Sequence, residues 1–388
     1  MDYGRQIVRA GLVNRFPGIS NRWLARGQRR ILSGFAGLAK RTDLDRLFAR
    51  VARRLIGAFL YSLKVEVNSR CDQACRMCYI RDRDAELNWQ AIRTLFARLR
   101  DKGVRMEILG GEPLLRGDIC DIIALAKREC RAPFVSLYTT ATRAGPGLAR
   151  ELKKAGLDAA IVSLMSRHPE THDDLAGRQG SFAAAAAGMA RLREAGIAVY
   201  SFTAVHAGNC GDVAAIDRYV RSELGCRPIF YQYVPQRPDD PLLMDSEEWR
   251  RIKHWALAEK NPGHMDFVRH FYMLTGNACS GGNFVLTVKA DGSVQPCPFV
   301  NDLPLGNIHD ADIWEIYRRR YRHPNYVAFK TPPAECAPCV YLSVCGGGCR
   351  AGNRMSLGSY GRRDLRCTGP FLGRIEKERI TDFVPSFF

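Results

Sequence analysis

Strand-like and helix-like segments alternate between residues 62 and 260, and this alternation constrains the fold more than any other feature of the chain. Short runs rich in β-branched and aromatic residues indicate strands, and longer stretches with apolar residues three and four positions apart indicate helices. Six such units in sequence predict a parallel sheet and suit a partial barrel better than a complete eight-fold one. The expected strands cover residues 63–68, 105–109, 134–139, 159–164, 198–205 and 228–234, and the expected helices cover 88–102, 117–130, 146–155, 181–195, 211–224 and 246–259.

The end of the first expected strand is followed by three cysteines, Cys71, Cys75 and Cys78, in the spacing C-x3-C-x2-C. In barrels of this kind the active site lies at the carboxyl ends of the strands. Three thiolates on one loop can hold three irons of a four-iron, four-sulfur cluster and leave the fourth iron open to another ligand. Isolated thiols and a zinc site are the alternatives that the spacing alone leaves open.

The end of the second expected strand carries a glycine pair and an acidic residue, Gly110-Gly111-Glu112, followed by Pro113. A glycine pair lets the backbone approach a ligand closely, and a carboxylate accepts hydrogen bonds from an ammonium group. A plain turn before the next helix is the alternative. Both motifs fall at the same edge of the expected sheet, which favours one shared site.

After residue 260 the segments shorten, and proline, glycine and cysteine become frequent. Clear helical periodicity shrinks to residues 313–321, and such a region needs other cross-links, which metal clusters supply. A zinc ribbon would use four of the cysteines and leave three unexplained. Seven cysteines follow a defined spacing, with Gly292 five residues before the second of them: Cys279, Cys297, Cys336, Cys339, Cys345, Cys349 and Cys367. Four others fit no spacing and are expected to be small buried residues: Cys120, Cys130, Cys210 and Cys226.

The composition is that of a soluble globular protein, since 46% of the 388 residues are hydrophobic and 25% are charged. No apolar run is long enough to predict a transmembrane helix, and the basic N-terminus lacks the features of a secretory signal. Fourteen cysteines, mostly in tight groups, indicate metal coordination in a reducing cytoplasm rather than a disulfide scaffold. We expect a cytoplasmic protein with an extension at 1–60, a barrel at 61–260 and a cysteine-rich domain at 261–388.

Much of the net charge of +18 lies in residues 1–60, which hold twelve arginines, one lysine and three aspartates. Apolar residues fall between the arginines at spacings near three and four, which predicts an amphipathic helix with a basic face. Such a helix can dock on the main domain, bind an acidic leader peptide or lie peripherally on an anionic membrane surface. Nucleic acid is not an expected partner, because no nucleic-acid-binding module accompanies the charge.

The cysteine triplet with Tyr79 after it, together with the motif at 110–113, resembles the signature of the radical S-adenosylmethionine (SAM) enzymes. The resemblance implies that the triplet holds a [4Fe-4S] cluster whose fourth iron binds SAM. The reduced cluster would cleave SAM to methionine and a 5′-deoxyadenosyl radical, which abstracts a hydrogen atom from the substrate, while the protein orients the reactants and excludes water. The SAM contacts that it implies are Gly110, Gly111 and Glu112 at the amino group, Met77 on the adenine and Ser163 at the ribose.

The seven C-terminal cysteines are similar to those of the SPASM extension, which binds two auxiliary [4Fe-4S] clusters. By that resemblance the outer cluster would have the ligands Cys336, Cys339, Cys345 and Cys367, and the inner cluster, nearer the active site, would have Cys279, Cys297 and Cys349. Residues 271–278 hold no cysteine, although some relatives carry one there. The inner cluster is therefore expected to have an open iron or a ligand other than cysteine.

The resemblance implies a reductant such as flavodoxin or ferredoxin and a substrate that is most often a peptide or protein, modified by crosslinking or oxidation. A small molecule or a membrane-associated lipid precursor is the alternative substrate, and a non-enzymatic iron–sulfur electron carrier is disfavoured by Glu112. Sulfatase maturation is disfavoured because Pro298, rather than a carboxylate, follows Cys297. Tyr231, Tyr233 and Arg237 would face the barrel mouth, as substrate contacts or as core packing, and no catalytic base can be chosen from the spacing.

Overall fold

The computed structural model describes residues 60–260 and 279–374, so the basic helix predicted before residue 60 falls outside the described residues. A single eight-stranded sheet in the order β6-β5-β4-β3-β2-β1-β7-β8 forms the centre of the molecule. All neighbouring strands from β6 to β7 run parallel, and β8 pairs antiparallel with β7. The strands are β1 (Ser62–Glu66), β2 (Arg105–Leu109), β3 (Val135–Thr139), β4 (Ala159–Ser163), β5 (Ala198–Val205), β6 (Arg227–Gln232), β7 (Val285–Val288) and β8 (Val294–Gln295).

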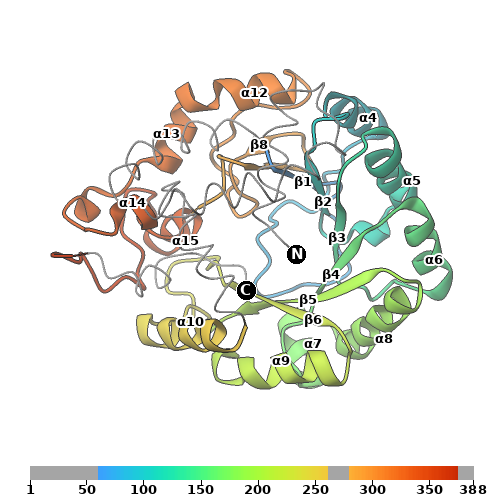
Figure 1. Ribbon diagram of the computed structural model, residues 1–388, viewed down its shortest axis with the longest axis horizontal. Helices are drawn as coiled ribbons and strands as arrows, with labels where there is room; N and C mark the ends of the chain where they lie inside the picture. The colour runs from blue at the N-terminus through green and yellow to red at the C-terminus, as the bar shows by residue number, and fades with distance from the viewer. Residues whose placement is uncertain (1–59, 261–278, 375–388) are drawn as a thin grey trace, which may run out of the picture.

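The sheet curves into a partial barrel, with the helices of the six β/α units on its outer side (Figure 1). Apolar side chains from the strands and from these helices form one continuous core. The helices are α4 (Trp89–Arg98), α5 (Ile119–Ala124) with a π-helical turn at Leu125–Glu129, α6 (Pro146–Ala155), α7 (Pro169–Ala176), α8 (Ser181–Glu194), α9 (Val213–Ser222) and α10 (Ser246–Lys260). The predicted partial (β/α)6 barrel is confirmed.

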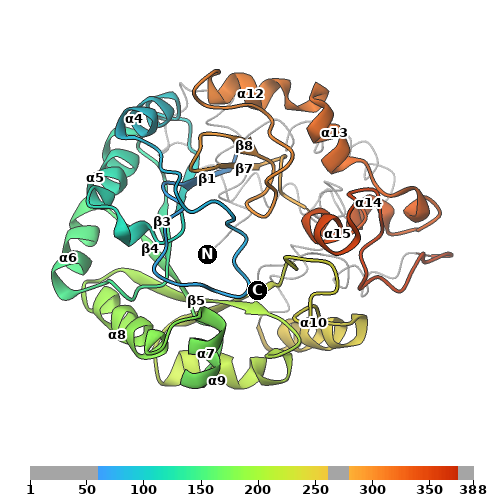
Figure 2. The same ribbon diagram turned by 180° about the vertical axis from the view of Figure 1, so that it is seen from behind.

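The C-terminal elements occupy the arc that the six units leave open, as both ribbon views show (Figures 1 and 2). Their helices are α12 (Ile313–Arg319), α13 (Pro324–Lys330), α14 (Leu342–Cys345) and α15 (Arg350–Leu357), with short 3-10 turns between them. Strand β7 extends the parallel sheet beyond β1, with Ser62 opposite Val285 and Val65 opposite Val288. The sheet thus includes a strand from the cysteine-rich region, which the sequence did not predict.

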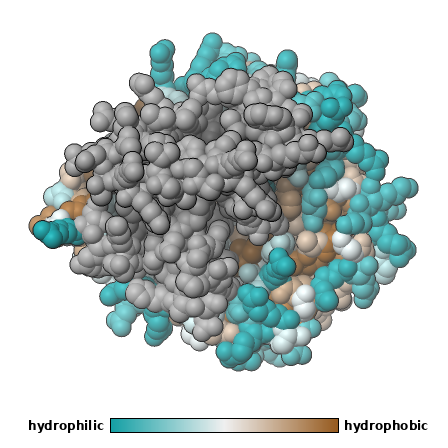
Figure 3. Space-filling view, viewed as in Figure 1, coloured by the Kyte–Doolittle hydropathy of each residue, from teal (hydrophilic) through white to brown (hydrophobic). Residues whose placement is uncertain are grey.

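Hydrophilic side chains gather at the rim of the face in Figure 3, and apolar ones lie nearer the middle of its visible part. This is the distribution of a barrel whose helices face water on one side and the sheet on the other. In the part of the chain that the structure describes, no helix has the length and apolar character needed to cross a bilayer.

Candidate functional site

The triplet loop leaves β1 at the carboxyl edge of the sheet and is held from two sides by backbone hydrogen bonds. On one side, the amides of Ala74 and Arg76 donate to the carbonyls of Ala176 and Leu175 at the end of α7, over 3.1 and 3.0 Å. Gly177 follows with a positive φ of 63°, and a Cβ there would lie 2.7 Å from the Ala74 carbonyl oxygen. Helix α7 therefore ends at a glycine, because a side chain at this position would clash with the backbone of the cysteine loop.

The glycine motif after β2 holds the other side of the loop. The amides of Gly111 and Glu112 donate to the carbonyls of Asn68 and Arg70 over 2.9 and 2.7 Å. A Cβ on Gly110 would lie 2.2 Å from Asn68 Oδ1, and one on Gly111 would lie 2.1 Å from the Arg70 carbonyl oxygen. The glycine pair is thus required for close packing against the start of the cysteine loop, whether or not a ligand also approaches it.

The Glu112 carboxylate is fully buried and already bound inside the protein. It accepts hydrogen bonds from Thr139 Oγ1, Leu114 N, Thr140 N and Thr140 Oγ1 over 2.6, 3.0, 2.7 and 2.8 Å. Burial raises its pKa, and these hydrogen bonds act in the opposite direction. Because a carboxylate has about four acceptor positions, this side chain ties the motif to the end of β3. Its predicted contact with the SAM amino group stays a prediction, as do those of Gly110 and Gly111.

The three thiols of the triplet are close enough to act on one another electrostatically. Burial raises the pKa of Cys71 to about 11 and that of Cys75 to about 12, and the neighbouring triplet thiols add to both shifts. Cluster binding would therefore release protons from this loop. Met77 is buried beside it in a small apolar group with Met165, Leu175, Ala204 and Tyr233, against which Cys75 packs.

Ser163 is half-buried and ends β4, opposite Phe202 in the register of β5. The rings of Phe202 and Tyr231 stack, with centroids 3.9 Å apart, and the Tyr233 hydroxyl donates to Asp240 Oδ2 over 2.6 Å. Core packing therefore accounts for both tyrosines, while Arg237 is exposed. The roles predicted for Met77 and Ser163 at the cofactor stay predictions.

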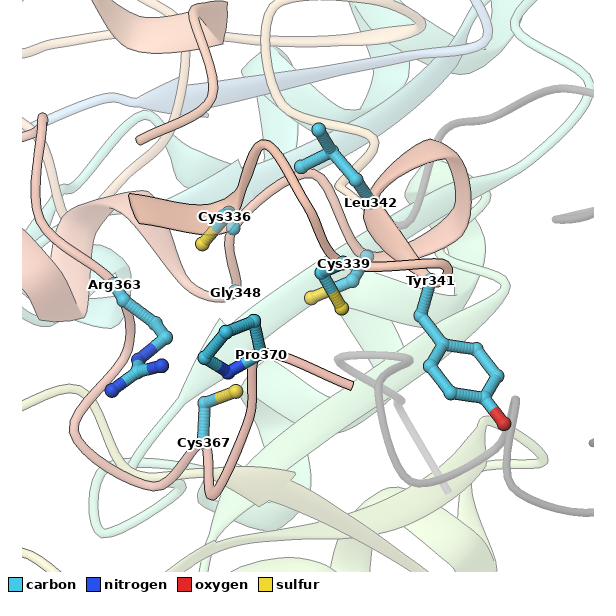
Figure 4. A pocket seen from close by; sticks show the side chains of 10 residues that line it. Cys336, Cys339, Tyr341, Leu342, Gly348, Arg363, Cys367 and Pro370 are labelled. Carbon is cyan, nitrogen blue, oxygen red and sulfur yellow. The ribbon is translucent and has the colours of Figure 1, made fainter. Parts of the chain in front are cut away.

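The four cysteines assigned to the outer cluster line one cavity together with Tyr341, Arg363 and Pro370. The sulfur atoms of Cys336, Cys339 and Cys367 point into the same space (Figure 4). Cys345 belongs to the same cavity lining and ends α14. The structure thus brings together the four residues that the resemblance to the SPASM extension grouped.

The three cysteines assigned to the inner cluster pack against one shared apolar cluster that includes Val300 and Phe329. Burial raises the pKa of Cys297 to about 12, and the thiols of Cys279 and Cys349 contribute to this shift. A Cβ on Gly281 would lie 3.5 Å from Cys279 Sγ and 3.6 Å from Cys297 Cβ, so these two residues are neighbours.

Consecutive glycines lead from the outer group to the inner one. Gly347 and Gly348 have φ values of 94° and 83°, which residues with a Cβ rarely adopt. A Cβ on Gly348 would lie 2.4 Å from Asp364 Cβ. The half-buried Asp364 carboxylate accepts from Cys349 N over 3.0 Å and pairs with Arg366 over 2.7 Å. Sequence spacing gave no signal for this pair, which fixes the loop between the two groups.

Arg350 supplies a test of whether these cysteines fit iron–sulfur clusters. Its side chain is buried, and its Nε and Nη2 atoms donate to the carbonyls of Phe329 and Thr331. Its Nη1 atom has no hydrogen-bond partner among the described residues, and thiols of both cysteine groups act electrostatically on the guanidinium. A buried donor without a partner is costly, and cluster sulfur atoms are acceptors, so the residues fit such a group.

Of the four cysteines outside these sets, Cys130, Cys210 and Cys226 are buried and Cys120 is half-buried. The burial of the first three agrees with the expectation that they are small buried residues.

Comparisons with known proteins agree with this geometry. The profile of the radical SAM superfamily matches residues 65–212, and that of the SPASM iron–sulfur cluster-binding domain matches residues 279–361. Both matches lie inside the predicted boundaries of the barrel and the C-terminal domain, and those boundaries stay predictions.

Related sequences bear two kinds of name. An AdoMet-dependent heme synthase of Nitratidesulfovibrio vulgaris is 24% identical, over 74% of this chain and 86% of the relative. A PqqA peptide cyclase of Methylocella silvestris is 25% identical, over 74% of this chain and 82% of the relative.

Solved structures share the fold. The anSMEcpe enzyme with bound AdoMet and a peptide superposes with a TM-score of 0.65 at 18% identity, over 83% of this chain and 95% of that one. Streptococcus suis SuiB bound to its precursor peptide SuiA superposes with a TM-score of 0.62 at 16% identity, over 94% and 88% of the two chains. These families bind [4Fe-4S] clusters and SAM. The chain is a radical SAM enzyme and belongs to the SPASM-domain subgroup of that superfamily.

Proposed function

We propose that this enzyme abstracts a hydrogen atom from a side chain of a peptide or protein substrate and thereby crosslinks or oxidises it. The observation that carries the proposal is the set of three cysteine groups, of which the triplet lies at the carboxyl edge of the barrel beside a buried apolar cluster. When bound, the triplet's cluster and SAM supply the 5′-deoxyadenosyl radical. The residues of the chain then have to orient the reactants and keep water out.

Two features of the chain serve these tasks. The backbone bonds to α7 and to the glycine motif fix the triplet loop before any ligand binds, which avoids an ordering cost on binding. The apolar group around Met77 and Met165 borders the loop and excludes water from its inner side. Cys71, Cys75 and Cys78 would hold the first cluster, and the two other groups would hold the auxiliary clusters.

The peptide substrate is supported by relatives named PqqA peptide cyclase, which align over 74% of the chain. Two structural neighbours were solved with peptides bound and share the fold over most of their length. Pro298 stands where sulfatase-maturing enzymes carry a carboxylate, so a crosslink or another oxidation is the proposed outcome.

A small-molecule substrate is the second candidate, and one observation favours it. Relatives named AdoMet-dependent heme synthase match the chain at 24–27% identity over 66–78% of its length. A lipid precursor reached from an anionic membrane surface is a variant of this candidate and rests on the basic residues 1–60.

The test begins with anaerobically reconstituted full-length protein, dithionite and SAM. Formation of 5′-deoxyadenosine without substrate should establish SAM cleavage, and the Cys71→Ala variant should form none. Short peptides encoded beside the gene, and separately tetrapyrroles and isoprenoid lipids, are then added with deuterated positions. Deuterium in 5′-deoxyadenosine together with loss of two hydrogens from a peptide supports the proposal. Transfer from a tetrapyrrole or lipid, with none from any peptide, would replace it by the second candidate.

A further inference from the structure

A buried ion pair lies between the triplet loop and the loop that carries Cys297. Glu66 is the last residue of β1, and Lys289 directly follows β7, which pairs in parallel with β1. The register therefore places the two residues side by side at the carboxyl edge of the sheet. Lys289 Nζ lies 3.0 Å from Glu66 Oε1, and the two side chains are only 9% and 4% exposed.

The ammonium end of this pair reaches the inner cysteine group. Lys289 Nζ donates to the carbonyl oxygen of Pro298, the residue after Cys297, over 2.6 Å. Its charge also acts on the Cys297 thiol, where it opposes the rise in pKa that burial causes. The positive charge therefore stands on the side of the inner auxiliary group.

The carboxylate end reaches the triplet loop. The hydroxyl of Tyr79, the residue after Cys78, donates a hydrogen bond to the Glu66 carboxylate. The Tyr79 ring lies 4.8 Å from Lys289 Nζ and packs edge-on against Phe299, with centroids 5.0 Å apart. Asn301 Nδ2 donates to the Tyr79 carbonyl over 3.3 Å and adds a second link between the loops.

Stability alone is a weak reason for such a pair, because desolvation of two buried charges offsets much of their attraction. The pair is, however, an oriented dipole between two iron–sulfur sites. The reduction potential of a cluster depends on nearby charge, since a positive charge stabilises the more negative reduced form.

We propose that Lys289 is a positioning residue that raises the reduction potential of the inner auxiliary cluster, that Glu66 moderates this effect, and that the pair thereby favours the inner cluster as electron acceptor. The inference rests on the proposed function, since it requires a cluster at Cys279, Cys297 and Cys349.

The experiment is an EPR-monitored redox titration of reconstituted full-length protein and its variants. The signal that changes when SAM is added belongs to the first cluster, and the other two are auxiliary. Lys289→Met should lower the inner midpoint, so that the reduced-to-oxidised ratio at the wild-type midpoint falls about tenfold, a shift of about 59 mV for one electron. Lys289→Arg keeps the charge and should stay near wild type.

Glu66→Gln provides the matched control, because it removes the partner charge and leaves Lys289 in place. It should shift the same midpoint upward, opposite to Lys289→Met, while the outer signal stays unmoved in all three variants. A folding defect would lower cluster content in both variants and would not give shifts of opposite sign. Iron content per chain and circular dichroism check this.

Equal midpoints in wild type, Lys289→Met and Glu66→Gln, with full cluster content, would overturn the inference alone. Equal shifts of the inner and outer signals in one direction would also overturn it, because they indicate a general structural change. Absence of any second auxiliary signal from wild-type protein would instead overturn the cluster assignment on which the inference depends.

Discussion

A single added methyl group at Gly111 should displace the triplet loop. The Cβ of an alanine there would lie 2.1 Å from the Arg70 carbonyl oxygen and 2.4 Å from that of Ser69, where ordinary contacts begin near 3.4 Å. Both obstacles are backbone atoms, so no side-chain rotation relieves the clash. The loop must therefore move by about 1.3 Å, the difference between the ordinary and the present distance.

That movement breaks specific bonds. The hydrogen bonds from Gly111 N to Asn68 O and from Glu112 N to Arg70 O, now 2.9 and 2.7 Å, would stretch beyond 3.5 Å. Two backbone hydrogen bonds contribute about 1 kcal/mol each, and overpacking costs about 1–3 kcal/mol. The expected loss for Gly111→Ala is about 3–5 kcal/mol, concentrated at the start of the triplet loop.

The assay is anaerobic reconstitution followed by iron and sulfide analysis and by the EPR response of the first cluster to SAM. Gly111→Ala should retain the auxiliary clusters and lose most of the SAM-responsive signal. Gly117→Ala is the matched control, because its Cβ would meet no atom within 4 Å and its φ is ordinary. A Gly111→Ala protein that assembles the first cluster and binds SAM like wild type would refute the steric argument.

Three further variants test other parts of the site. Glu112→Gln turns one acceptor oxygen into a donor that faces buried donors, so the free energy of unfolding should fall by about 1–3 kcal/mol and the melting temperature should fall with it. A wild-type melting temperature would contradict the role of this carboxylate in binding the motif to the end of β3. Cys367→Ser should lower the iron content per chain by about one cluster, while Cys226→Ala should leave it unchanged. Equal iron losses in the two variants would contradict the assignment of Cys367 to the outer group. Burial lowers the pKa of His172 from 6.5 to about 4, so the stability that the neutral imidazole contributes is complete above pH 6.5 and falls as the pH drops toward 4. His172→Asn keeps an acceptor for the Met165 amide, so the melting temperature of cluster-free protein should depend less on pH across that window. An unchanged pH dependence of the melting temperature would place the titration at another group.

The barrel was predictable because its periodicity is local. The expected helix at 146–155 matches α6 residue for residue, and the expected strands differ from β1–β6 by two residues or fewer at each end. Helix α7 was missed because its eight residues are mostly polar and carry little apolar periodicity. Strand β7 was missed because four residues in a cysteine-rich region carry too little pattern to indicate a strand.

The sequence indicated which residues make up the candidate site, but not the contacts that hold them in place. The resemblance to the SPASM extension grouped four outer cysteines that the structure places around one cavity, and three inner cysteines that it places against one apolar cluster. Spacing could not show that Gly110 and Gly111 face the backbone of residues 68–70, a contact across some forty residues of sequence. Nor could it pair Glu66 with Lys289, which stand 223 positions apart. Long-range contacts of this kind depend on sheet register, which sequence patterns fix only after the neighbouring strand is known.

The three cysteine groups differ in how the chain holds them, and this difference bears on what the clusters do for folding. The triplet loop is tied to α7 and to the glycine motif by backbone hydrogen bonds, so its shape follows from the barrel. The outer group lies on short turns and on α14, which has four residues, around a cavity that its thiols share. A structural metal centre contributes folding energy where the chain alone supplies little. A cluster held by the outer group would therefore stabilise the cysteine-rich region around it, whereas the barrel already holds the triplet loop by backbone hydrogen bonds.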